Sequence, residues 1–196
     1  MIDWQKRLLL FTLTALLAES LAFAGQTPAG ELSLLGLTGR KVNPLHATQA
    51  KATVFLFTRS DCPISNRYAP EVRRLYEKFA PRGITFWLVY PDPNETAGAI
   101  RKHLKEYEYP FGALRDPGHS LVKLTGAKVT PEAAIFLRAG KMVYHGRIDD
   151  LYVDFGKARH APTTHDLEQA LDADIEGKPV KEASAPAVGC FISDLK

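Results

Sequence analysis

Cysteine is scarce in this sequence, which has only Cys62 and Cys190 among its 196 residues. No C-x-x-C pair and no H-E-x-x-H segment occurs, and no histidine lies close to a cysteine along the chain. These absences argue against a zinc site, and the sequence predicts neither a bound metal nor a cofactor. The histidines are His46, His103, His119, His145, His160 and His165.

An excess of charge of one sign is also missing, since the formal net charge is only +3. No stripe of basic residues with interleaved aromatic residues occurs along the chain. Such stripes are typical of surfaces that bind nucleic acid, so the sequence predicts no nucleic-acid partner. There is no internal repeat, and the length suits one domain with a substantial core.

The sequence has no apolar run long enough to span a bilayer. The run Leu8–Ala18 has 11 residues, well short of the ~20 that a membrane-spanning helix needs. Lys6 and Arg7 precede this run, and the small-x-small pattern of a cleavage site follows it at residues 22–24. These features predict a signal peptide cleaved near Ala24, with a retained membrane anchor as the alternative.

Export would place the mature chain in the periplasm or outside the cell, without membrane attachment. Both are oxidising compartments, where two cysteines can form and keep a disulfide. We divide the chain into a signal peptide (1–24), one domain (25–177) and a C-terminal tail (178–196) that carries Cys190. The tail is rich in Lys, Ala, Pro and Ser, and is predicted to be loosely held.

Two apolar runs predict buried parallel strands with a helix between them. Thr53–Thr58 and Ile84–Tyr90 are apolar along most of their length, as expected for strands covered on both faces. From Cys62 to about Ala80, apolar residues recur every three or four positions, which indicates one buried helix face. Pro63 suits the first position of this helix, and Pro70 should kink it. Strand, helix and strand in this order predict a parallel βαβ unit.

The second half of the chain predicts an antiparallel hairpin, with a tight turn at Ala139-Gly140. Together the two halves predict a mixed α/β sandwich. The long connection Asp149–Pro162 is interpreted as either a functional lid or a mobile loop. The acidic pair at its start, Asp149 and Asp150, is interpreted as a solvated strand end. The other predicted elements are strands at Glu31–Leu35, Phe111–Leu114, Ala134–Arg138 and Met142–His145, and helices at Glu95–Tyr107, His119–Leu124 and Thr164–Glu176, the last ending at Gly177.

Cys62 lies where an apolar strand ends and a helix begins. Its sulfur would face unpaired backbone N–H groups and the positive end of the helix dipole. Both stabilise a thiolate, the form that attacks disulfides and peroxides. Arg59 and Arg67 would add to this stabilisation, whereas Asp61 would oppose it if its carboxylate lay close.

Three motifs resemble the thioredoxin superfamily. Residues 62–65 (Cys-Pro-Ile-Ser) occupy the place of the redox motif, and Ala69-Pro70 follows at the spacing of the kinked first helix. Thr130-Pro131, just before the hairpin, resembles the cis-proline that faces the active-site cysteine in that fold. The strand and helix between Tyr90 and Gly118 resemble the insertion of the redoxin and peroxiredoxin branch.

This resemblance covers roughly residues 30–177, and the tail at 188–192 resembles a peroxiredoxin-like subgroup of exported bacterial redoxins. It implies an α/β, thioredoxin-like three-layer sandwich, in which helices flank a mixed central sheet that carries a redoxin-type insertion.

The motif departs from both branches of the superfamily at Ser65. Disulfide-exchange enzymes normally have their second cysteine there, and peroxiredoxins have their peroxidatic cysteine there, after a proline and a threonine that Thr58 and Cys62 do not reproduce. Cys62 therefore needs an external thiol, or a distant one in the chain, to release it from a mixed disulfide. Cys190 can reach it, because the 13 residues after Gly177 span up to about 45 Å. The alternatives are a permanent Cys62–Cys190 staple or two inert thiols.

Pro63, Ser65, Thr130 and Pro131 are predicted to bind substrate. Thr130 and Pro131 would shape the groove for a substrate backbone or a peroxide, or else form a plain turn before a strand. Ser65 would donate a hydrogen bond to the sulfur of Cys62, or be an ordinary serine of the first helical turn.

The leading hypothesis is an exported thiol-based oxidoreductase with Cys62 and Cys190 as its catalytic residues. Its partners would be protein disulfides, small thiols or peroxides, together with an unidentified external reductant. The alternative is a non-enzymatic thioredoxin-fold module that binds a partner protein or copper, the latter through Cys62 with His160 or His165.

Overall fold

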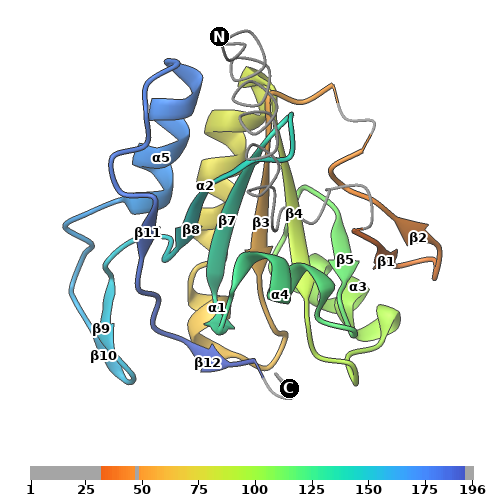
Figure 1. Ribbon diagram of the computed structural model, residues 1–196. Helices are drawn as coiled ribbons and strands as arrows, with labels where there is room; N and C mark the ends of the chain where they lie inside the picture. The colour runs from red at the N-terminus through yellow and green to blue at the C-terminus, as the bar shows by residue number, and fades with distance from the viewer. Residues whose placement is uncertain (1–31, 47–48, 193–196) are drawn as a thin grey trace, which may run out of the picture.

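The computed structural model describes residues 32–46 and 49–192, so the predicted signal peptide lies outside the described residues. Within them the chain forms a mixed eight-stranded sheet packed between helices, which confirms the predicted fold class (Figure 1). In spatial order the sheet contains β11 (Ser184–Ala185), β8 (Met142–Gly146), β7 (Glu132–Leu137), β3 (Ala52–Phe57), β4 (Ile84–Tyr90), β5 (Ala113–Arg115), β1 (Leu34–Gly36) and β2 (Lys41–Val42).

The remaining elements are helices and two small two-stranded sheets. None of the helices in the described ranges is long and apolar enough to cross a membrane. The helices are α1 (Pro63–Arg67), α2 (Ala69–Phe79), the 3-10 turn η3 (Ala80–Arg82), α3 (Ala97–Glu106), α4 (Ser120–Thr125) and α5 (Asp166–Ile175). The small sheets pair β9 (Tyr152–Asp154) with β10 (Lys157–Ala158), and β6 (Val129–Thr130) with β12 (Cys190–Phe191).

Strand β3 lies at the centre of the sheet and is buried on both faces, as its apolar sequence predicts. It runs parallel to β4 and antiparallel to β7. Successive strand side chains point to opposite faces, so Val54 and Leu56 belong to one core and Phe55 and Phe57 to the other. Because helices cover both faces, an alternating polar pattern would be unfavourable here.

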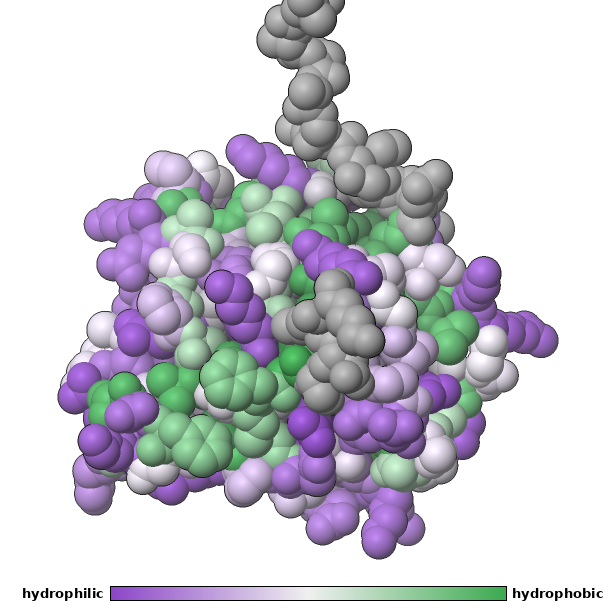
Figure 2. Space-filling view, turned by 60° about the horizontal axis from the view of Figure 1, so that its bottom comes forward, coloured by the Kyte–Doolittle hydropathy of each residue, from purple (hydrophilic) through white to green (hydrophobic). Residues whose placement is uncertain are grey.

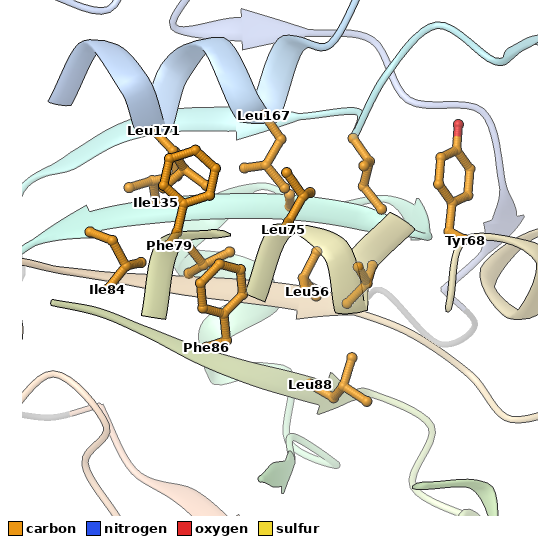
Figure 3. Packing of buried hydrophobic residues seen from close by; sticks show 14 of the residues in the cluster. Leu56, Tyr68, Leu75, Phe79, Ile84, Phe86, Leu88, Ile135, Leu167 and Leu171 are labelled. Atoms are coloured by element: carbon orange, nitrogen blue, oxygen red, sulfur yellow. The ribbon is translucent and has the colours of Figure 1, made fainter. Parts of the chain in front are cut away.

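The larger core lies between the sheet, α2 and α5. Figure 3 shows Leu75 and Phe79 of α2 meeting Leu167 and Leu171 of α5 beside Ile135 of β7. All five side chains are fully buried, each contributing about 1.5–3 kcal/mol relative to an exposed position. This packing fixes the helix that follows Cys62 against the sheet. The smaller core, on the opposite face, includes α4.

The predicted kink at Pro70 is confirmed as a break between α1 and α2. Pro70 has no N–H group to continue the helical ladder, and α1 ends at Arg67. The N–H of Tyr68 donates to the carbonyls of Ser65 (3.0 Å) and Ile64 (3.3 Å), which tightens the last turn. The short α1 is therefore a separate unit that presents its N-terminus at the end of β3.

The acidic pair at the start of the long connection is buried, so its interpretation as a solvated strand end is wrong. The hydroxyl of Tyr68 donates to Asp149 at 2.6 Å, and the N–H groups of Thr163 and Thr164 donate to Asp150 at 2.5 and 2.9 Å. These hydrogen bonds hold the pKa of Asp150 below its ordinary value, whereas burial raises the pKa of Asp149. Part of the connection forms the β9–β10 hairpin.

A cluster of ion pairs joins α2 to α5. Arg74 contacts both Glu71 and Glu168, and Lys78 contacts Glu168 and Asp172, each Lys78 pair at 2.8 Å. Hydrogen bonds from Arg74 and Lys78 lower the pKa of Glu168 to about 2. Since the folded-state pKa lies below the ordinary value of 4.5, the carboxylate stabilises the fold above pH 4.5. That stabilisation is lost as the pH falls through about 2.

Glu168→Gln is therefore expected to lower the free energy of unfolding at pH 7 and to flatten the acid limb of the stability curve between pH 4.5 and 2. Urea unfolding at several pH values measures both effects. Glu77→Gln, which changes an exposed carboxylate on α2, is the matched control and should leave the acid limb unchanged. An unaltered acid limb in Glu168→Gln would contradict the conclusion that the Glu168 carboxylate stabilises the fold.

Candidate functional site

Cys62 is the N-cap residue of α1, as the sequence predicts. Its backbone is extended (φ −87°, ψ 109°), and Pro63 begins the helix. The N–H of Ser65 points at the sulfur, with an N···Sγ distance of 3.5 Å. Cys62 is only 1% exposed. A sulfur in this position receives the unpaired N–H groups that stabilise a thiolate.

Cys62 and Cys190 form a disulfide bond. Their Cα atoms are 6.2 Å apart, although 128 positions separate them in the sequence. Cys190 lies in β12, whose antiparallel pairing places Cys190 opposite Thr130 and Phe191 opposite Val129. The two cysteines that the sequence singled out are thus brought into one site.

The Thr130–Pro131 peptide bond is cis, as the resemblance implies. The carbonyl oxygen of Thr130 lies 3.2 Å from the sulfur of Cys62, and its hydroxyl donates to the carbonyl of Cys190 at 3.5 Å. In the reduced protein the Cys62 thiol can donate its hydrogen to this carbonyl. Cys62, Cys190, Thr130 and Pro131 therefore form one contiguous group.

Ser65 is buried beneath this group, but its hydroxyl does not contact the sulfur of Cys62 by a hydrogen bond. Within the described residues the hydroxyl oxygen has no hydrogen-bond partner, and the backbone N–H makes the contact instead. Any residue other than proline at this position would supply the same donor. Ser65 thus takes its place in the site through its main chain.

The C-terminal tail is docked on the domain, so the prediction that it is loosely held is wrong for residues up to 192. Strand β11 extends the main sheet by pairing in parallel with β8. The carbonyl of Ala185 accepts the N–H of Arg147 at 3.0 Å, and Gly146 makes room for this contact. A Cβ atom on Gly146 would lie 2.1 Å from the carbonyl oxygen of Ala185. The tail is thus anchored five residues before Cys190.

Arg59, one of the two arginines expected to stabilise a Cys62 thiolate, lies among acidic residues. Arg59 pairs with Asp61 at 2.8 Å and approaches Asp92 at 3.6 Å, so acidic neighbours neutralise much of its charge. The same guanidinium donates to the carbonyl of Phe191 in β12 at 3.5 Å. Arg59 therefore holds the tail as well as lying near the start of α1.

Glu95 supports the loop before Cys62, a role that its sequence context did not reveal. Its carboxylate accepts the N–H of Ser60 at 2.8 Å, and burial raises its pKa. Glu95 lies two positions before the first residue of α3 and 35 positions from Ser60, so no local pattern connects the two.

A copper site involving Cys62 finds no support in the geometry. Among the described residues, the group of three side chains with metal-ligating spacing is Glu71, His165 and Glu168, which contains no cysteine. Its two carboxylates already accept hydrogen bonds from Arg74. This group is therefore part of the ion-pair cluster between α2 and α5.

Solved structures of similar fold include an uncharacterised conserved protein and a hypothetical protein. One, from Geobacillus kaustophilus, is 30% identical, has a TM-score of 0.70, and is matched over 82% of this chain and 87% of its own. The other, from Sinorhizobium meliloti 1021, is 27% identical, has a TM-score of 0.72, and is matched over 87% and 94%. A secreted disulfide oxidoreductase of Mycobacterium tuberculosis, 16% identical with a TM-score of 0.51 over 78% of this chain and 99% of its own, shares the fold.

Two curated relatives are named as thiol-disulfide oxidoreductases. The thiol-disulfide oxidoreductase ResA of Bacillus thuringiensis and that of Bacillus cereus are each 24% identical over 107 residues, 55% of this chain. The match spans 60% of the length of these relatives. Residues 26–145, more than half of the chain, match the model of the AhpC/TSA family. The chain therefore belongs to the AhpC/TSA family, within the thioredoxin-like redoxins.

Proposed function

We propose that this protein is an exported thiol-disulfide oxidoreductase in which Cys62 is the nucleophile and Cys190 the resolving thiol. The observation that carries the proposal is the bond between a cysteine at a helix N-terminus and a cysteine on the tail. The activity named for ResA supports it. Residues 1–24 would direct export, and the domain 25–177 would carry the tail 178–196.

The proposed reaction has two exchange steps. The Cys62 thiolate attacks one sulfur of a substrate disulfide, forms a mixed disulfide, and releases the other substrate sulfur as a thiolate. The Cys190 thiolate then attacks the Cys62 sulfur, closes the Cys62–Cys190 bond and expels the second substrate thiolate. The substrate disulfide gains two electrons and the protein loses two.

Regeneration would begin at Cys190 rather than Cys62. Cys62 is 1% exposed, whereas Cys190 is partly exposed, so an external thiolate has access to the tail sulfur. Attack there expels Cys62 as the leaving thiolate, which the N–H of Ser65 and the α1 N-terminus stabilise. Ordinary small dithiols can serve as this reductant in the laboratory.

Thiol peroxidase activity is the second candidate, because the chain belongs to the AhpC/TSA family. In that reaction the Cys62 thiolate would take one oxygen from a peroxide to form a sulfenic acid and release an alcohol or water. The Cys190 thiol would then condense with the sulfenic acid, forming the same disulfide and water. Both candidates end at the bond observed here.

The choice between the candidates is tested by the rate at which each oxidant closes the bond. The reduced full-length protein is mixed with one equivalent of glutathione disulfide or hydrogen peroxide, and its free thiols are counted with time. We expect closure by the disulfide to be at least tenfold faster. Faster closure of the disulfide by peroxide would favour thiol peroxidase activity instead. If neither oxidant closes it, the non-enzymatic binding module would be favoured.

A further inference from the structure

The contacts that hold β12 against β6 are mainly hydrogen bonds to main-chain atoms of the tail. The N–H of Ile192 donates to the carbonyl of Lys128 at 2.9 Å, and the hydroxyl of Thr130 donates to the carbonyl of Cys190. Arg59 donates to the carbonyl of Phe191. Because these contacts use tail backbone atoms, they would hold any extended polypeptide in the same register.

The side chains of β12 and of Ile192, the residue that follows it, point in alternating directions. Cys190 faces Cys62, Phe191 is 80% exposed, and Ile192 is 5% exposed as a member of the smaller core cluster. Figure 2 shows apolar side chains gathered on the end of the molecule where β12 lies. The site therefore selects a cysteine and an apolar residue two positions later, and leaves the residue between them free.

The residue before the cysteine has no room for a side chain. A Cβ atom on Gly189 would lie 2.2 Å from the carbonyl oxygen of Thr130 and 2.6 Å from its carbonyl carbon. Both are backbone atoms beside the cis peptide bond, and they cannot turn away as the end of a flexible side chain can. Close approach of the two backbones thus requires glycine at this position.

We propose that β12 is an intramolecular occupant of a groove that binds polypeptide substrates as an extended strand. The preferred segment has glycine before its cysteine and an apolar residue two positions after it, and the tail and the substrate exclude each other. This inference rests on the proposed function and names its substrate class. Small thiols and peroxides have no main chain to fill the edge of β6.

Mutual exclusion gives the tail a part in product release. The tail is anchored at β11, and only a few residues separate β11 from Cys190. Cys190 therefore stays close to the groove while a substrate occupies it. When the tail re-forms β12, it takes the hydrogen-bonding positions of the substrate segment at the moment that Cys190 displaces its sulfur. The closed disulfide then blocks further binding until a reductant frees Cys190.

The test uses the reduced full-length protein with Gly189→Ala and Cys190→Ser, which weakens tail docking and removes the resolving thiol. The probe is a peptide with the sequence of residues 186–192, carrying thionitrobenzoate as a mixed disulfide on its cysteine. Cys62 attacks the peptide sulfur and expels coloured thionitrobenzoate, so the absorbance gives the rate. Comparison peptides replace the glycine by alanine, the isoleucine by aspartate, or the phenylalanine by alanine. The thionitrobenzoate disulfide of mercaptoethanol is the small control.

We expect the tail-sequence peptide to react at least tenfold faster than the alanine-for-glycine peptide, the aspartate peptide and the small control. The peptide without phenylalanine should react within twofold of it. Equal rates for all probes would overturn the proposal that the groove selects polypeptide substrates, while leaving the oxidoreductase proposal intact. No reaction of Cys62 with any probe would overturn both.

Exclusion by the tail is tested separately in the Cys190→Ser variant, which keeps Gly189. Its tail can still dock, so the tail-sequence peptide should react at least fivefold more slowly than with the double variant. The small control should show less difference between the two variants. Equal peptide rates in both would overturn the role of the tail as an occupant.

Discussion

Cys62→Ser is expected to reduce disulfide-reductase turnover at least a thousandfold, because no other group at the helix N-terminus can form the mixed disulfide. The reduced variant should unfold within about 1 kcal/mol of the reduced wild type, since the serine hydroxyl can donate to the Thr130 carbonyl that lies 3.2 Å from the sulfur. Steady-state assays with a small dithiol as reductant and urea unfolding measure the two effects.

Cys190→Ser is the matched control for this loss. It should form the mixed disulfide on Cys62 at a rate within twofold of wild type, and then accumulate it, because the resolving thiol is gone. Loss of the first step in Cys190→Ser, or retained turnover in Cys62→Ser, would contradict the assigned roles. A large loss of stability in reduced Cys62→Ser would mean that the residue is mainly structural.

Reduction of the disulfide is expected to lower the melting temperature of the wild type by about 10 °C. The bond closes a loop of 128 positions, and chain-entropy arguments give such loops up to about 5 kcal/mol. For a chain of this size, 1 kcal/mol corresponds to about 2–4 °C. Freedom gained by the released β12 strand reduces the effect below its upper limit.

Thermal unfolding with and without dithiothreitol measures this difference. Cys190→Ser should melt at one temperature in both conditions, close to that of the reduced wild type. Identical melting temperatures for the oxidised and reduced wild type, with the bond verified by mass spectrometry, would show that the bond carries no stability. The tail would then be a redox element only.

The central elements were predictable because their signals are local. The apolar runs of β3 and β4 and the spacing of Leu75 and Phe79 in α2 each lie within one element. The proline at 70 interrupts the helical ladder through its own covalent structure, so the break between α1 and α2 follows from the sequence alone.

The tail strands were not predictable, because each has two residues and its partner lies far away in sequence. Ser184 pairs with His145, and Cys190 pairs with Thr130. No periodicity can arise in two residues, so tertiary contacts decide whether such strands form. The burial of Asp149 was missed for a similar reason, since its partner Tyr68 is 81 positions away.

The sequence predicted that Cys62 and Thr130 lie together in the candidate site, but not which residues support them. Cys62 and Thr130 carry recognisable motifs, and the structure places them in contact. Glu95 and Arg59 support the same region through contacts with Ser60 and the tail that no motif describes. Ser65 lies in the motif, but its side chain does not make the predicted hydrogen bond to Cys62. Its backbone N–H contacts the sulfur instead.

The order in which the two sulfurs react shows which of them is the nucleophile. Reduced wild-type protein is mixed with one equivalent of glutathione disulfide, quenched with acid at successive times, and mapped by mass spectrometry of its peptides. We expect glutathione on Cys62 first, followed by its replacement with the Cys62–Cys190 bond. Glutathione appearing first on Cys190, or remaining on Cys62 without closure of the bond, would contradict the roles proposed for the two cysteines.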